Sequence, residues 1–524
     1  MSSLFADNTE RIGMRVSSCF NARRSTSGAS RTCCRVALTA LLAVGVVVSS
    51  VAISGCALRS RTLSSHSQSD EVRRFVPAEP VRWSLPNGLR VIFLQDNELP
   101  LVRGKLLIRG GSLWASEYPV GTTSAMGDGM RSGGAGELSA DELDKELEKL
   151  AAGVSSSFSA EYGGVSFSCL ASDIDRVFPI FSDVVLRPRF EKDRLALWKG
   201  QSLEGIRRRV EDPSTVAGLA FLQLVYGDSA YGKVSRSRDI SLISQTDLFN
   251  LHRHLVRPDG AYLVVTGQIS QSKVVELAQQ FLGGWTPRGE PLPPPPPVPQ
   301  EPKPGIYFIT LPFAQASVKF GQLGVARFTP DYPAIDVFNE VFGSGGFGSR
   351  LMKRVRTELG LSYGVYGGIS PGRVRGTNYV FVQTKAASTG SAIDESIAVL
   401  EDLQRQVPTD EELDEKKLAI TNSYVFNFNS KDEVASRVAS QELLEYPVDY
   451  DKTYLAKINS VQPADVTSVA AARWDPTKLV VVVVGNQQAL AALEQERGKP
   501  GSRLSGFDLH KLGFDETASL PPAR

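Results

Sequence analysis

Two long stretches of the chain repeat one order of apolar patterns. Short runs rich in β-branched residues predict strands, and apolar residues at helical spacing, such as Leu143, Leu147 and Leu150, predict helices between them. The expected strands are 89–94, 102–108 and 261–267 in the first stretch, and 306–309, 317–321 and 479–485 in the second. Strand meanders mixed with packed helices indicate an α+β fold of two homologous domains, each a mostly antiparallel sheet packed with helices.

A proline run separates the two stretches and predicts a stiff polyproline II spacer, since proline has no amide hydrogen to give to a helix or a central strand. The boundaries expected from these patterns are 1–55 for a leader, 56–77 for a flexible tether, 78–288 for the first domain, 289–304 for the linker, 305–505 for the second domain and 506–524 for a tail.

The leader contains an apolar, uncharged segment, Val36–Ser54, preceded by Arg31 and Arg35. The segment runs into Cys56 through small residues, which resembles a bacterial lipobox. We therefore expect a signal peptide and lipidation at Cys56, with the body anchored at the cell envelope and facing the periplasm. Ala57 after the cysteine favours the outer membrane. A plain N-terminal membrane anchor is the alternative.

Charge and cysteine content argue against two classes of protein, those that bind nucleic acid and those that disulfides stabilise. The chain has 58 basic and 57 acidic residues, a net charge of +1, which argues against nucleic-acid binding. Of five cysteines, only Cys56 and Cys169 would remain after removal of the leader. With Cys56 lipidated, no disulfide could form in the body. Cys169 lies in an alternating segment and is expected to pack in a core.

Four short motifs point to one family. They are LPNGL at 85–89, RGGS at 109–112, GGFGSRL at 345–351 and RTELGLSY at 356–363. Their order resembles the insulinase and pitrilysin zinc peptidases, in particular the mitochondrial-processing-peptidase branch, over residues 80 to 500. The resemblance implies a helix bearing H-x-x-E-H in the first domain and a distant glutamate on another helix, which together hold zinc.

The residues at the positions of that metal site cannot serve it. Counted from the motif's lead-in, the histidine positions hold Ser124 and Asp128, the base position holds Gly127, and the distant ligand position holds Gly205. Glu204 is one residue away, which is about 100° around a helix. The sequence therefore predicts that this chain binds no metal or other cofactor.

Other catalytic schemes also lack their residues. Of four histidines, His252 and His254 lie two residues apart at an expected helix end, where we expect them to face solvent as capping residues. The chain has no G-x-S-x-G nucleophile elbow. The glycines at 343–346 are not followed by the Lys and Ser/Thr that a phosphate loop needs.

The second domain retains residues that can act on a substrate. Arg356 and Tyr363 match the family's pair that binds the substrate backbone and stabilises the tetrahedral intermediate, and Gly345, Gly346 and Phe347 match its substrate-binding block. A guanidinium and a phenol can stabilise developing oxyanion charge. The alternative is structural: Arg356 would form a surface ion pair and Tyr363 would pack at a strand start.

Three functions are compatible with these residues. The first is a zinc-less subunit that complements a zinc-bearing homologue in a heterodimer, so that only the complex hydrolyses peptides; another copy of this chain is the alternative partner. In the heterodimer the zinc belongs to the partner. The second is a non-enzymatic scaffold or peptide-binding lipoprotein. The third is a self-sufficient zinc peptidase with unusual ligands.

Overall fold

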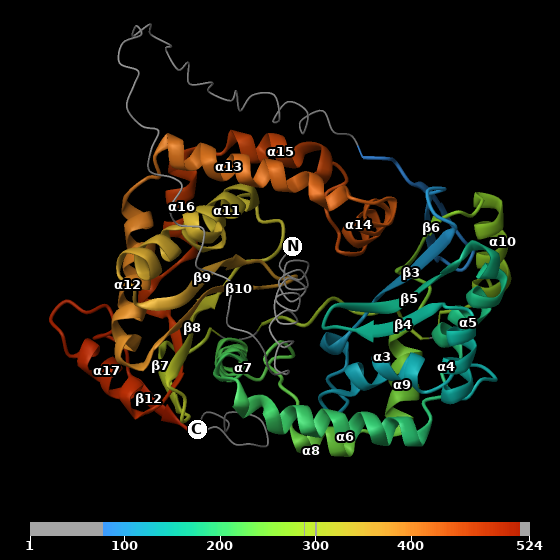
Figure 1. Ribbon diagram of the computed structural model, residues 1–524, viewed down its shortest axis with the longest axis horizontal. Helices are drawn as coiled ribbons and strands as arrows, with labels where there is room; N and C mark the ends of the chain where they lie inside the picture. The colour runs from blue at the N-terminus through green and yellow to red at the C-terminus, as the bar shows by residue number, and fades with distance from the viewer. Residues whose placement is uncertain (1–76, 288, 299–300, 514–524) are drawn as a thin grey trace, which may run out of the picture. The chain divides into compact units, whose positions relative to one another are not determined.

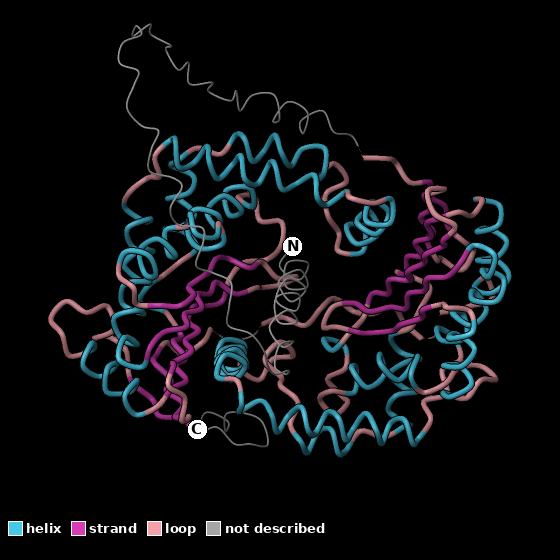
Figure 2. The backbone as a smooth tube through the Cα atoms, in the orientation of Figure 1, coloured by secondary structure: helices cyan, strands magenta, loops and turns pink. Residues whose placement is uncertain are grey.

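The computed structural model describes residues 77–287, 289–298 and 301–513. This part of the chain forms two six-stranded sheets, each packed with helices (Figures 1 and 2). The α+β prediction is confirmed.

The first sheet contains β1 (Val81–Ser84), β2 (Arg90–Gln95), β3 (Leu101–Arg109), β4 (Gly153–Phe158), β5 (Tyr162–Leu170) and β6 (Ala261–Gly267). The helices of this half are α3 (Thr122–Ser132), α4 (Ala140–Lys149), α5 (Ile174–Leu186), α6 (Lys192–Arg208), α7 (Pro213–Tyr226), α8 (Ser237–Leu242), α9 (Gln245–Leu255) and α10 (Gln271–Leu282).

The second sheet contains β7 (Gly305–Thr310), β8 (Gln315–Leu323), β9 (Ser362–Ser370), β10 (Thr377–Lys385), β11 (Val480–Gly485) and β12 (Leu509–Leu512). The helices of this half are α11 (Tyr332–Asn339), α12 (Thr389–Arg405), α13 (Asp410–Tyr424), α14 (Lys431–Leu443), α15 (Tyr450–Ser460), α16 (Pro463–Arg473) and α17 (Gln487–Arg497).

The two sheets share their topology. Five strands follow the order β2-β6-β3-β5-β4 in the first and β7-β11-β8-β10-β9 in the second, with one parallel pair, β2/β6 or β7/β11, in each. The other pairs within these five strands are antiparallel. This agreement supports the duplication expected from the sequence.

The sixth strand differs between the sheets. β1 pairs antiparallel with β2, whereas β12 pairs parallel with β7. Because β12 lies within the segment expected to be a tail, 506–524, the second sheet extends beyond residue 505. His510 on β12 stacks on the Tyr307 ring with centroids 5.0 Å apart, so it is part of this sheet rather than of a tail.

The last core strand of each half is buried on both faces, which explains its unbroken apolar sequence. Along β11, Val481 and Val483 pack into the main core of the second half, while Val480, Val482 and Val484 point to the opposite face. A second layer must therefore cover that opposite face of each sheet.

Each half supplies one helix to cover the other half's sheet. From α7, Val216, Ala220 and Phe221 pack against β7, β8 and β11 of the second sheet. From α14, Ala435, Ala439 and Leu443 pack against β2, β3 and β6 of the first sheet. Figure 1 shows α7 beside β8 and α14 beside β6. This reciprocal exchange joins the halves through buried apolar surface.

Charged and polar contacts hold both ends of α14. Its first residue, Lys431, pairs with Asp96 at 3.3 Å, and Asp432 accepts a hydrogen bond from Thr266 at 3.0 Å. Just beyond its last residue, Glu445 pairs with Arg109 at 2.5 Å. These contacts fix the register of the exchanged helix on the first sheet.

The proline-rich segment is held against the first half. The Pro293 carbonyl accepts a hydrogen bond from Trp114 Nε1 at 2.8 Å, and the Pro296 carbonyl accepts one from the Tyr231 hydroxyl at 3.1 Å. Proline carbonyls remain free to accept such bonds because the segment forms no sheet or helix.

The predicted leader and Cys56 lie outside the described residues. Within the described ranges, no helix combines the length and the apolar character that a membrane span requires.

Candidate functional site

The degenerate metal motif lies on an unbroken helix, α3. Ser124 and Asp128 are exposed and, four residues apart, share one face of it. Asp128 Oδ2 accepts a hydrogen bond from Trp198 Nε1 of α6 at 2.8 Å. The two histidine positions therefore still face α6, which carries the position of the distant ligand.

Gly127, at the position of the catalytic base, points toward the sheet. A Cβ atom at Gly127 would lie 2.6 Å from the Phe158 backbone nitrogen of β4, closer than real Cβ atoms come to such a neighbour. The Gly127 carbonyl also accepts a hydrogen bond from the Ser156 hydroxyl at 2.6 Å. Helix α3 thus packs on the edge strand β4 so closely that only glycine fits at this position.

The distant ligand position is open but bears no ligand. Gly205 is exposed, with no atom near its absent side chain. Glu204 is 58% exposed and pairs with Arg207 at 3.6 Å. Within the described residues, no three His, Cys, Asp or Glu side chains are grouped so that they could hold a metal ion.

Gly205→Ala is expected to raise the free energy of unfolding by about 0.5–1 kcal/mol, because the helix interior gains a residue of better propensity and the methyl group meets open space. Urea unfolding of the two proteins measures the difference. Gly127→Ala is the matched change in α3, and its effect should have the opposite sign. Equal effects at both positions would contradict the packing argument.

The histidines of α9 and Cys169 do not form a catalytic group in the described residues. His252 was expected to face solvent but is buried, and its Nε2 lies 2.8 Å from the Val185 carbonyl. That prediction was wrong because α5 packs over the end of α9, while His254 is exposed. Cys169 packs in the first core as predicted, and burial raises the pKa of its thiol to about 12, so it is a poor nucleophile at neutral pH.

The glycine-rich block lies between two π-helical turns, Glu340–Ser344 and Met352–Glu358. Such turns are rare and occur frequently at functional sites. Gly346 adopts a positive φ of 59°, and Phe347 is 73% exposed at the tip of the block. The sequence did not predict the π-helical turns, because no local signal distinguishes them from α-helix.

Arg356 is half-buried, and Tyr363 is exposed. The Arg356 guanidinium lies over the Phe347 ring at 4.8 Å, and its Nη1 contacts Met352 Sδ at 3.8 Å. It forms no ion pair with any described residue, so the alternative of a surface ion pair is not what the structure shows. Tyr363, on the edge strand β9, is 49% exposed.

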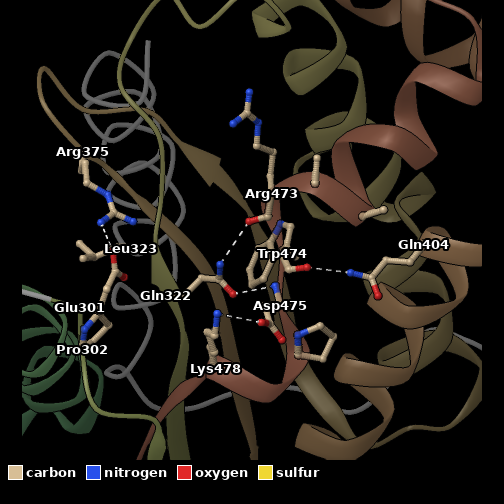
Figure 3. Close-up of a pocket in the computed structure, with 13 residues that line it drawn as sticks. Glu301, Pro302, Gln322, Leu323, Arg375, Gln404, Arg473, Trp474, Asp475 and Lys478 are labelled. Atoms are coloured by element: carbon tan, nitrogen blue, oxygen red, sulfur yellow. Dashed lines mark hydrogen bonds and ion pairs between the residues drawn. The ribbon is translucent and has the colours of Figure 1, made fainter.

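A separate hollow in the second half is structural (Figure 3). Gln322 donates to the Arg473 carbonyl at 3.2 Å and accepts from the Asp475 amide at 3.0 Å. Gln404 donates to the Trp474 carbonyl at 2.9 Å. The amide side chains of the hollow therefore hold the segment that joins α16 to β11.

Comparison with known proteins agrees with this architecture. Residues 90–221 match the family model described as insulinase (peptidase family M16), and residues 243–420 match the model described as peptidase M16 inactive domain. The chain belongs to the insulinase family. It is a member whose α3 lacks the H-x-x-E-H motif.

Relatives within the insulinase family carry contrasting names. The chain is 27% identical over 247 residues to an uncharacterized zinc protease of Mycobacterium leprae, covering 43% of this chain and only 55% of that protein. It is 21% identical to a non-peptidase homolog of Helicobacter pylori, covering 76% of this chain and 92% of that one. The crystal structure of a peptidase M16 inactive domain from Pseudomonas fluorescens matches with a TM-score of 0.71 and 26% identity, covering 78% of this chain and 98% of that one.

Proposed function

We propose that this chain is the non-catalytic subunit of a two-component insulinase-family peptidase. A zinc-bearing homologue would supply the metal and the base, and this chain would supply Arg356 and Tyr363 to bind the substrate backbone and the developing oxyanion. The observation that carries the proposal is a half-buried arginine without an ion pair among the described residues, followed by an exposed tyrosine on the next strand, β9, in a chain whose motif helix α3 lacks the zinc ligands. A lipid on Cys56 would hold the complex at the outer membrane, facing the periplasm, as the lipobox-like sequence suggests.

The unpaired state of Arg356 matters because a structural arginine would normally be satisfied by a carboxylate. Its neighbour Arg354 illustrates the contrast, since it pairs with Glu395 at 3.0 Å and with Glu358 at 3.5 Å. A cation–π contact leaves the guanidinium donors free to reach a carbonyl or an oxyanion. Arg356 is therefore suited to a ligand and Arg354 to the fold.

The test is cleavage of an unfolded peptide by the full chain, alone and mixed with a zinc-motif homologue from the same genome. Cleavage only in the mixture, abolished by a chelator, supports the complementing subunit. Cleavage by this chain alone would overturn the assignment of the ligand positions. Stable association without cleavage would favour the scaffold function. The name of the Helicobacter relative, non-peptidase homolog, supports that alternative.

Arg356→Ala is expected to lower kcat of the mixture about a hundredfold, the effect of removing one preorganised donor to an oxyanion. The free energy of unfolding should change by less than about 1 kcal/mol, because the side chain makes no ion pair. Lys353→Ala is the matched control: it removes an exposed cation from the same helical turn and should leave kcat unchanged. Wild-type cleavage by the Arg356 variant would exclude assistance by this residue.

A further inference from the structure

A lysine without an acidic partner lies in the middle of the second sheet. Lys319 is on β8, next to the central strand β11, and its ammonium lies 5.4 Å from the Phe221 ring centroid and 5.2 Å from that of Tyr379. No hydrogen bond or ion pair joins it to any described residue. It is the one charged residue of its strand, QASVKFGQL.

The surroundings of Lys319 are apolar on the side of the open sheet edge. In the strand register Lys319 lies opposite Phe381, and Phe381 lies opposite Tyr366 on the edge strand β9. The Phe381 and Tyr366 rings are 5.1 Å apart, and Tyr366 is 47% exposed. Beside Tyr366 on the same face, Gly364 leaves open space. A row of one cation and two rings therefore runs from β8 to the edge strand β9, on the face of the sheet that α7 covers over β8 and β11.

On the side of β11, helix α7 covers the sheet next to Lys319. Its register partner on β11, Val482, is buried beneath α7 together with Val480 and Val484. Phe221 of α7 lies against the ammonium itself. A chain that entered from the open edge would thus have to end at Lys319.

We propose that Lys319, Phe381 and Tyr366 form a receptor for the C-terminus of a peptide that ends in an apolar or aromatic residue. The terminal carboxylate would pair with the Lys319 ammonium, and the last side chain would lie on the Phe381 and Tyr366 rings. An unpaired, half-buried cation favours an anion more strongly than an exposed lysine does, because water screens the pair less. Closure by α7 selects a chain end over an acidic side chain within a longer peptide.

This receptor goes beyond the proposed function, since it binds a peptide end without a zinc subunit and without Arg356. Burial also lowers the pKa of the Lys319 amine. Binding requires the ammonium form, so affinity should fall as pH rises through that lowered pKa, before an ordinary lysine would lose its proton.

The test measures fluorescence anisotropy of a labelled hexapeptide ending in phenylalanine, as the free acid and as the C-terminal amide, with the full chain. The acid is expected to bind about tenfold more tightly than the amide, which corresponds to one charge-assisted hydrogen bond. Lys319→Met keeps the aliphatic stem and should reduce this preference to less than about twofold. Lys385→Met, which removes an exposed cation from the end of β10, should preserve it.

A second variant addresses the aromatic part of the receptor. Tyr366→Ala changes an exposed side chain, so the fold should be retained, and it should weaken the peptide ending in phenylalanine more than one ending in alanine. The proposal is overturned if wild-type protein binds acid and amide alike or binds neither, or if a folded Lys319→Met variant keeps the full preference. None of these results bears on the cleavage assay of the mixed subunits.

Discussion

Replacing Gly127 with glutamate, the residue the family uses as its catalytic base, is expected to destabilise the chain by about 3 kcal/mol or more. The first carbon of the new side chain would lie 2.6 Å from the Phe158 backbone nitrogen, so α3 and β4 would have to separate. The carboxylate would then be buried against the strand without a partner. Urea unfolding monitored by circular dichroism measures the loss.

Two matched variants isolate that packing effect. Ser124→His and Gly205→Glu each introduce a family ligand at an exposed position and should change the free energy of unfolding by less than about 1 kcal/mol. If Gly127→Glu proves as stable as these two, the close contact between α3 and β4 is wrong. The expected pattern implies that β4 occupies the space of the base side chain and that the ligand positions hold no ligands. Restoring the motif residues alone would therefore not restore the metal site.

Asp451→Ala is expected to cost about 3 kcal/mol, the lower end of the effect of removing one partner from a buried ion pair, because Arg437 and Asp451 are 13% and 22% exposed. The Asp451 carboxylate accepts hydrogen bonds from Arg437 at 2.6 Å, from the Tyr424 hydroxyl at 2.8 Å and from Gln441 at 2.8 Å. Without it, the Arg437 guanidinium would stay largely shielded from water and would lack a carboxylate partner. Thermal or urea unfolding measures the cost, and Asp449→Ala, at an exposed carboxylate nearby, should have little effect.

The same carboxylate predicts acid sensitivity. Burial alone would raise the pKa of Asp451, but the hydrogen bonds and charge of Arg437, with those of Tyr424 and Gln441, hold it below the ordinary value. A lowered folded-state pKa contributes stability above the unfolded-state pKa, and that contribution is lost as pH falls through the folded-state value. The difference in stability between wild type and Asp451→Ala should therefore shrink in acid. A difference that stays constant down to low pH would contradict this assignment.

The Asp451 network also governs the exchanged helix. Arg437 and Gln441 lie on α14, whose Ala435, Ala439 and Leu443 cover the first sheet. Removing the Asp451 carboxylate should therefore weaken the packing of α14 on the first sheet as well as the second half itself. We expect Asp451→Ala to increase hydrogen exchange in β2 and β6, which are far from the substitution in sequence.

The sequence by itself determined the repeated α+β plan and the loss of metal ligands. Both depend on local information: β6 and β11 are unbroken apolar runs because both of their faces are buried, and a histidine that is missing from the chain cannot be supplied by folding. It also singled out Arg356 and Tyr363 as candidate residues through their motif spacing, and their part in substrate binding stays a prediction.

Only the tertiary structure decided what each of these residues faces. The exchange of α7 and α14, the contact of Gly127 with β4, the burial of His252 and the place of Lys319 between α7 and the open sheet edge all join residues distant in sequence. Hydrophobic periodicity predicts which face of an element is buried but not which element covers it. The hydrophobic stabilisation is roughly proportional to the apolar area that is buried, and it has no direction. The partner of each face is fixed by packing.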